Sequence, residues 1–172
     1  MQLTFAIMKQ LFLVRHAKSS WDDPTLSDFD RPLNERGKKD APAMAKKLRD
    51  RKIKIDAAIS SPAKRAKQTA KHFIREFDLK KKNVVLESKL YEAGEESFQE
   101  VVESLKNKWK SVALFSHNPG ITSFAHSLTE TKIDDMPTCS ILAIKINTDK
   151  WKDFRSAKKE FIFFDYPKAD EE

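Results

Sequence analysis

The sequence has few residues of the kinds that cross-link, anchor or divide a chain. Cys139 is the only cysteine among 172 residues, so no internal disulfide can form and a reducing, cytoplasmic location is the simplest expectation. Lys9 interrupts the apolar N-terminus and no small-residue cleavage site follows, so we expect neither a signal peptide nor a membrane span. No segment repeats at a fixed period and no linker is evident. These absences indicate a single domain that spans residues 1–172. Its core should cover about residues 9–165, followed by an acidic tail at 166–172.

Acidic residues are fewer than basic residues in this chain. The chain carries 33 Lys and Arg against 26 Asp and Glu, a formal net charge of +7. Such a surface attracts acidic or phosphorylated partners at long range without identifying them. Nucleic-acid binders interleave exposed aromatic residues with basic ones, whereas the phenylalanines here fall on predicted core stripes. We therefore expect a monomer with no nucleic-acid and no membrane partner.

Strand-length apolar runs alternate with segments of helical period. The runs lie at 10–14, 57–60, 84–86 and 112–115, and apolar positions at helical spacing follow at 41–48, 66–77, 98–109 and 121–128. Two β-rich runs, 140–146 and 161–165, come last. The pattern predicts an α/β three-layer sandwich, with a mostly parallel central sheet, helices on both faces and antiparallel edge strands. Pro42 should kink the first helix or mark its first turn, and Ser61 and Pro62 should cap and begin the second.

Conspicuous polar residues follow the four predicted parallel strands. In open α/β sheets, ligands bind beyond the carboxyl ends of the strands, so these residues should share one rim. They are Arg15, His16, Arg65, Glu92, His117 and Asn118. Two of only three glycines, Gly94 and Gly120, flank this rim, where the backbone must turn sharply or approach something closely. Because neighbours on a straight strand face opposite ways, Arg15 and His16 both reach the rim only if the chain bends there.

Arg65 lies in the first turn of its predicted helix, together with Lys64 and Lys67. The helix dipole disfavours a cation there by about 0.3 to 1 kcal/mol, so a compensating anion is expected. A bound phosphate could be this anion, since it would accept hydrogen bonds from the free backbone N–H groups and from a guanidinium that can donate to two oxygens at once. The alternative is that these side chains simply extend into water.

Two histidines, His16 and His117, each end a strand beside a turn. With two arginines on the same rim they suit a phosphoryl group, because several fixed donors can surround its oxygens while one neutral imidazole attacks phosphorus. The competing chemistry is a metal site completed by Glu92 or Asp22. A divalent cation would repel the neighbouring arginines, so we expect no metal and no cofactor.

Four motifs carry a resemblance to a known family. "LVRHAKS", "SSPAKRAKQTA", "LYEAG" and "FSHNPG", in this order and at this spacing, resemble the histidine phosphatase superfamily, which includes the phosphoglycerate mutases. The compact SixA-type phosphohistidine phosphatases within it are the most similar. The resemblance covers roughly residues 9–146. Ala17 stands where the first motif usually has glycine, a small departure that is common in this branch.

The resemblance implies a role for each matching residue. His16 is the nucleophile that becomes transiently phosphorylated. The groups that hold the phosphoryl oxygens are Arg15, Arg65 and His117. Glu92 matches the acid that protonates the leaving oxygen in larger members, although the SixA-type branch shows no strong acid at this step. The expected substrate-contacting residues at the mouth are Ser19, Asp22 and Asn118.

Only 24 residues separate Glu92 from His117, and one helix and one strand consume nearly all of them. No room remains for the helical insertion that covers the site in the mutases. Water would reach the phosphoenzyme, which favours a phosphatase. An open site also suits a phosphohistidine on a phosphotransfer protein. The alternatives are a phosphatase acting on a small phosphomonoester and, in another class, a non-catalytic phosphoprotein-binding module.

Overall fold

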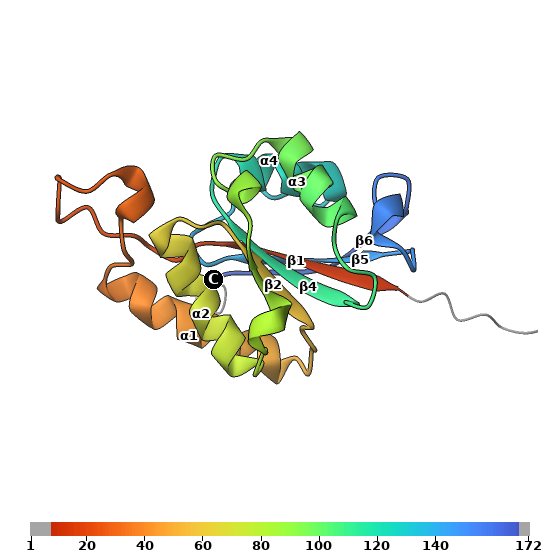
Figure 1. Cartoon of the computed structure of the whole chain (residues 1–172), viewed down its shortest axis with the longest axis horizontal. Coiled ribbons are helices and arrows are strands. Elements are labelled where there is room, and N and C mark those ends of the chain that lie inside the picture. Colours follow the sequence, from red (N-terminus) through yellow and green to blue (C-terminus); the bar gives the residue numbers. More distant parts are fainter. Residues whose placement is uncertain (1–7, 169–172) are drawn as a thin grey trace, which may run out of the picture.

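The computed structural model describes residues 8–168, within which six strands form one sheet in the order β3-β2-β4-β1-β5-β6 (Figure 1). The strands are β1 (Lys9–Arg15), β2 (Ala57–Ser60), β3 (Val84–Leu86), β4 (Ser111–Ser116), β5 (Ile141–Ile146) and β6 (Lys159–Asp165). Strands β3, β2, β4 and β1 are parallel. Strand β5 pairs antiparallel with β1, and β6 pairs antiparallel with β5. The predicted α/β class and its antiparallel edge are confirmed.

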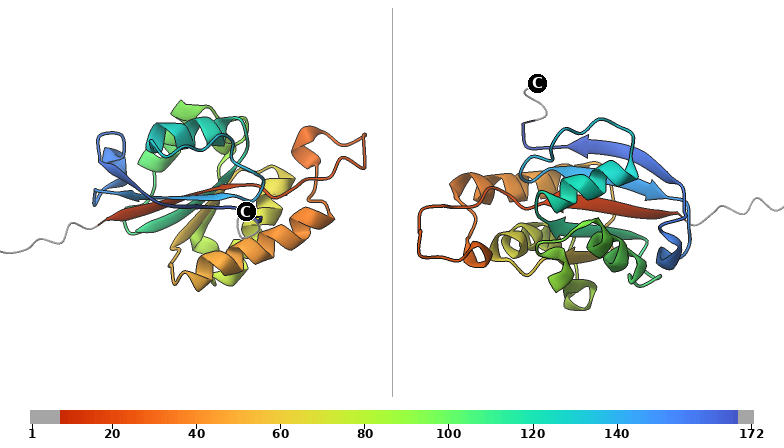
Figure 2. Two further views of the ribbon diagram at one scale, coloured as in Figure 1. Left: turned by 180° about the vertical axis from the view of Figure 1, so that it is seen from behind. Right: turned by 90° about the horizontal axis from the view of Figure 1, so that it is seen from above.

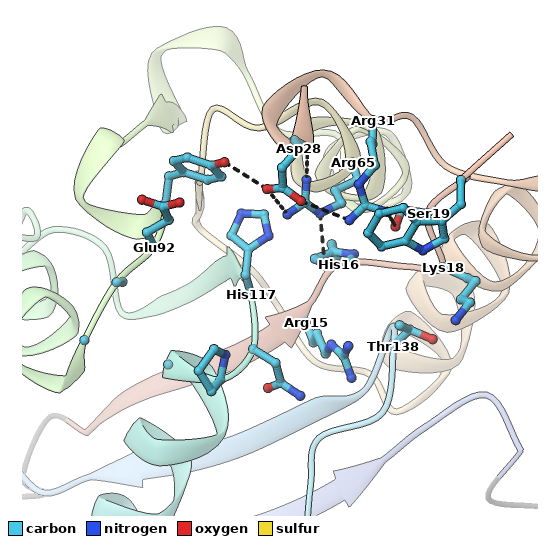
Figure 3. A pocket seen from close by; sticks show the side chains of 17 residues that line it. Arg15, His16, Lys18, Ser19, Asp28, Arg31, Arg65, Glu92, His117 and Thr138 are labelled. Carbon is cyan, nitrogen blue, oxygen red and sulfur yellow. Dashed lines mark hydrogen bonds and ion pairs between the residues drawn. The ribbon is translucent and has the colours of Figure 1, made fainter. Parts of the chain in front are cut away.

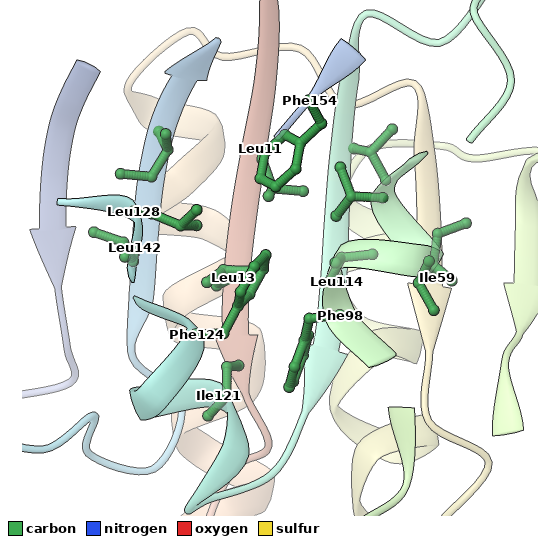
Figure 4. Packing of buried hydrophobic residues seen from close by; sticks show 14 of the residues in the cluster. Leu11, Leu13, Ile59, Phe98, Leu114, Ile121, Phe124, Leu128, Leu142 and Phe154 are labelled. Atoms are coloured by element: carbon green, nitrogen blue, oxygen red, sulfur yellow. The ribbon is translucent and has the colours of Figure 1, made fainter. Parts of the chain in front are cut away.

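Helices cover both faces of the sheet (Figures 1 and 2). The α-helices are α1 (Glu35–Asp50), α2 (Lys64–Glu76), α3 (Glu95–Glu103) and α4 (Gly120–Leu128), and the short 3-10 turns are η1 (Asp28–Asp30), η2 (Lys81–Asn83), η3 (Ser88–Leu90) and η4 (Trp151–Asp153). Strand β1 shows the alternation that builds two cores. Leu11 and Leu13 pack with α3 and α4, as Figure 4 shows, while Phe12 and Val14 pack with α1 and α2.

The structure excludes one of the two alternatives for Pro42 and shows that the predicted start of the second helix is wrong. Helix α1 begins at Glu35, because the Asn34 side chain accepts a hydrogen bond from the backbone N–H of Gly37 at 2.9 Å. Pro42 therefore lies inside α1 and does not mark its first turn. Helix α2 begins at Lys64, not at Pro62, and its N-cap makes no side-chain hydrogen bond. Ser61 is not the cap, because the N-cap is Ala63, two residues later; the Ser61 hydroxyl contacts a histidine ring and accepts from the N–H of Ala63 at 3.3 Å.

Helix α3 is also shorter than the apolar stripe predicted. It ends at Glu103, and the N–H of Ser104 contacts the carbonyls of the last turn. Leu105 and Trp109 are nevertheless buried in the same core as α3. A turn places them there, with the N–H of Trp109 donating to the Lys106 carbonyl at 2.9 Å. Spacing alone could not separate helix from turn, since both bury these side chains.

The carboxyl ends of β1, β2 and β4 open onto one edge of the sheet. From this edge the arm, residues 19–33, projects away from the body, at the left of Figure 1 and again in both views of Figure 2. A bridge between Ser19 and Leu33 closes its base. No helix within residues 8–168 is long and apolar enough to cross a membrane. The expectations about a signal peptide and about the end of the acidic tail concern residues 1–7 and 169–172, which lie outside the described part.

Candidate active site

A pocket of about 680 Å³ lies at the carboxyl ends of the parallel strands, between the arm and the segment that precedes α3 (Figure 3). Residues from five separate chain segments line it. The predicted ones among them are Arg15, His16, Ser19, Arg65, Glu92, His117 and Asn118. Strand β1 ends at Arg15, and both Arg15 and His16 line the pocket although they are neighbours in sequence. The predicted juxtaposition of two imidazoles and two guanidiniums is therefore present.

His16 is buried and oriented at both ring nitrogens. Its Nδ1 lies 2.8 Å from the carbonyl oxygen of Ala17, which can only accept, so Nδ1 carries the proton. Its Nε2 is therefore unprotonated, and its lone pair accepts a hydrogen bond from Nε of Arg65 at 3.2 Å. Burial, together with the nearby His117 and arginines, lowers the pKa of His16 to about 3. The ring is neutral at pH 7, as a nucleophile must be.

His117 lies beside His16, with ring centroids 5.0 Å apart. Its Nε2 is 2.7 Å from the hydroxyl of Ser61, and its Nδ1 is buried with no partner among the described residues. When Ser61 donates, the neutral ring carries its proton on Nδ1, and that N–H has no acceptor among the described residues. Burial, with a smaller effect of Arg65, lowers the pKa of His117 to about 4.

Arg15 is held by the loop that precedes β5. Its Nη1 donates to the Met136 carbonyl at 2.7 Å and lies 4.0 Å from a carboxylate oxygen of Asp135. Its Nε is buried without a partner among residues 8–168. The backbone N–H of Cys139 contacts the carbonyls of both Arg15 and His16 at 3.1 Å, which fixes the backbone at the end of β1. The Cys139 side chain itself is buried in the core.

Arg65 does point into the site, yet a protein carboxylate already compensates its charge. Its Nη1 donates to the main-chain carbonyl of Asp28 at 2.6 Å, and its Nη2 donates to Asp28 Oδ2 at 3.0 Å. The Tyr91 hydroxyl donates to the same Oδ2 at 2.8 Å, and Arg31 contacts Oδ1 at 3.1 Å. Burial opposes ionisation of Asp28, but the hydrogen bonds from Tyr91, Arg65 and Arg31 outweigh it and lower its pKa to about 2.

Sequence reasoning missed Asp28, Arg31 and Tyr91 as parts of the site. One signal was available for the first two, since both lie in the loop that follows the carboxyl end of β1, the place where ligands bind in such sheets. Tyr91 directly precedes Glu92, which was selected by that same argument. The order of the residues could not show that Asp28 reaches a residue 37 positions away.

Ser19 and Asp22 were expected to line the mouth together, and the structure separates them. Ser19 is buried and its hydroxyl accepts a hydrogen bond from Arg31 at 2.8 Å. Asp22 is exposed and is not among the residues that line the pocket, and its contact with a substrate stays a prediction. Its backbone N–H turns back to the Ser20 hydroxyl at 3.1 Å, and Trp21 occupies the wall instead, stacked 3.5 Å from the Arg31 guanidinium.

Glu92 and Asn118 both line the pocket. Glu92 is exposed and has a left-handed backbone conformation, with φ of 53°. Its role as an acid stays a prediction. The amide nitrogen of Asn118 donates to Asp135 at 2.8 Å, and its oxygen accepts from Thr122 at 2.6 Å. Asn118 therefore fixes the loop that holds Arg15, and its contact with a substrate also stays a prediction.

Gly120 allows a close approach behind the pocket. A Cβ atom at Gly120 would lie 1.9 Å from the carbonyl oxygen of Ala93, so only glycine lets α4 start against this segment. A Cβ at Gly94 would meet nothing within 4 Å. Of the two glycines predicted to matter at the rim, one is required by packing. Within residues 8–168, no three or more His, Cys, Asp or Glu side chains are grouped so as to hold a metal ion.

Comparisons with known proteins agree with this geometry. The model of the histidine phosphatase superfamily (branch 1) matches residues 11–100. An uncharacterised chloroplast protein of Arabidopsis thaliana is 28% identical over 156 residues, which cover 86% of this chain and 71% of that protein. A 2,3-bisphosphoglycerate-dependent phosphoglycerate mutase of Bartonella tribocorum is 36% identical over 70 residues, which cover 40% of this chain and 34% of the mutase.

Among solved structures, one assigned as the phosphohistidine phosphatase SixA from Agrobacterium tumefaciens has a TM-score of 0.77 and 27% sequence identity. The match covers 92% of this chain and 98% of that one. Family and structural neighbours together support phosphatase activity. The chain therefore belongs to the histidine phosphatase superfamily, and its fold resembles that of the SixA-type members.

Proposed function

We propose that this protein is a metal-independent phosphatase that removes the phosphoryl group from a phosphohistidine of a signalling protein, through a phosphohistidine intermediate on His16. One observation carries the proposal. A buried, neutral imidazole presents an unprotonated Nε2 into a pocket, with the Arg65 guanidinium 3.2 Å away and a second imidazole, His117, 5.0 Å away between ring centroids. This is the arrangement that attack on phosphorus requires.

The reaction would take two displacements. In the first, the Nε2 lone pair of His16 forms a bond to phosphorus while the bond from phosphorus to the substrate nitrogen breaks, and the substrate imidazole, already protonated on its other nitrogen in the phosphohistidine, leaves as a neutral ring. In the second, water attacks phosphorus, releases a proton, and returns the electron pair to Nε2. Arg15, Arg65 and the Nδ1–H of His117 would hold the equatorial oxygens in both steps.

The open pocket supports a protein substrate. Helix α3 and strand β4 take up most of the stretch between Glu92 and His117, so no inserted segment from it covers the site. Water can then reach the phosphoenzyme, which favours hydrolysis over transfer back to a sugar acid. A phosphohistidine also needs little help from Glu92, because an imidazole leaves more readily than an alkoxide.

The test uses a histidine phosphotransfer protein phosphorylated chemically with labelled phosphoramidate. The enzyme is mixed with it and quenched in alkaline detergent, where phosphohistidine survives. The wild type should release phosphate and carry transient label on His16, His16→Ala should do neither, and the matched variant His72→Ala, a histidine that does not line the pocket, should behave as the wild type.

Four results would contradict the proposal. Label on another residue would refute the mechanism, and loss of turnover in chelator would refute metal independence. Turnover of an aryl phosphate without turnover of the phosphoprotein would favour the small phosphomonoester, and binding without turnover of either would favour a binding module. The cytoplasmic location, the monomeric state and the absence of nucleic-acid and membrane partners remain predictions.

A further inference from the structure

We propose that Asp28 is a positioning residue, which holds one edge of the Arg65 guanidinium so that the other edge faces the nucleophilic nitrogen of His16. The inference rests on the proposed phosphatase reaction and concerns the same site. Asp28 lies in η1, on the arm, 37 positions before Arg65. It does not reach the reacting atoms itself and acts through the arginine (Figure 3).

A guanidinium offers two donor edges, and both are in use here. The end edge consists of Nη1 and Nη2, and the side edge consists of Nε and the second hydrogen of Nη2. Asp28 takes the end edge through its carbonyl oxygen at 2.6 Å and its Oδ2 at 3.0 Å. The side edge faces His16, whose Nε2 accepts from Nε at 3.2 Å. A phosphoryl group formed on Nε2 would meet this same side edge, so Asp28 need not be displaced.

The Asp28 carboxylate also joins the two walls of the pocket. Tyr91, from the opposite wall, donates its hydroxyl to Oδ2 at 2.8 Å, and Arg31, from the arm, contacts Oδ1 at 3.1 Å. The Tyr91 ring packs edge-on between Phe29 of the arm, at 5.1 Å, and His117, at 5.6 Å. The position of the arm and the direction of Arg65 are therefore fixed by one group.

Asp28→Asn tests the inference against a matched control. Asp30→Asn removes the same charge from the same turn, but the Asp30 carboxylate accepts from the Ser27 hydroxyl at 2.7 Å and does not contact Arg65. With an aryl phosphate as substrate, Asp28→Asn should lower kcat about 10- to 100-fold, the range for a lost hydrogen bond to a charged group, with KM changed less than about threefold. Asp30→Asn should change kcat less than about twofold.

Inhibitor affinities separate positioning from general structural damage. Orthovanadate mimics the five-coordinate phosphorus of the transition state, whereas inorganic phosphate resembles the product. Asp28→Asn should weaken vanadate binding at least about tenfold more than phosphate binding, measured by calorimetry. Equal weakening of both, or unchanged kcat, would overturn the inference. Tighter phosphate binding would show that Asp28 competes with the phosphoryl group for Arg65.

A double-mutant cycle with Arg65→Lys tests the route of the effect. Because Asp28 acts through Arg65, adding Asp28→Asn to Arg65→Lys should cost less than about twofold further in kcat. A multiplicative loss would overturn the inference. If the wild type turns over the aryl phosphate while Asp28→Asn equals it, the inference alone fails. If the wild type is inactive on every phosphorylated substrate, the proposed function fails.

Discussion

Acidification should destabilise this protein through its two active-site histidines. The pKa of His16 is about 3 and that of His117 about 4 in the native protein, against 6.5 for the unfolded residue, because burial penalises the charged rings. Below pH 6.5 the unfolded chain binds protons that the native protein does not, so stability is lost as the pH falls. Each ring that stays neutral while its unfolded counterpart becomes protonated costs about 1.4 kcal/mol per pH unit.

The size of the loss in stability between pH 7 and pH 5 depends on the pKa of the unfolded histidines, because the pKa values of His16 and His117 in the native protein both lie below 5. Between pH 7 and pH 5 each histidine should remove about 2 kcal/mol, and the pair about 4 kcal/mol, from the free energy of unfolding. The test uses the double variant His16→Asn, His117→Asn, which lacks both titrating rings. Urea denaturation in phosphate-free buffer, at both pH values, gives the difference between wild type and variant, in which the contributions of all other groups cancel. If both proteins lost the same stability over this interval, the two imidazoles would not be desolvated and neutral as described.

Two further predictions concern packing and orientation around the site. Gly120→Ala would place a Cβ against the Ala93 carbonyl and should lower the free energy of unfolding by about 2 to 3 kcal/mol, measured by thermal or urea unfolding. The control Gly94→Ala, whose Cβ would have no neighbour within 4 Å, should lower it by less than about 1 kcal/mol. Equal losses in the two variants would contradict the close approach of Gly120 to Ala93. Ser61→Ala removes the hydroxyl that orients His117 and should lower kcat/KM about tenfold, and an unchanged rate would show that His117 needs no such partner.

The sequence by itself determined the class of fold and the location of the site. Apolar runs of strand length, alternating with helical stripes, can bury their apolar surface only in a layered α/β sandwich, which is what the structure shows. The carboxyl ends of parallel strands meet at one edge, so Arg15, His16, Arg65 and His117 had to share a rim. These predictions depend on the period of the apolar residues, which is local, and on the alternation of strands with helices along the chain, which favours parallel strands.

Tertiary structure alone decided how the charges are paired. The sequence indicated that Arg65 needs an anion, but Asp28 became that anion only because η1, one turn of the arm, lies against α2. Tertiary packing also leaves Asp22 exposed and places the Ser61 hydroxyl against the His117 ring. Side-chain partners depend on where loops come to rest against distant elements. Neither residue type nor spacing encodes that position, because a loop has no fixed period from which its direction can be derived.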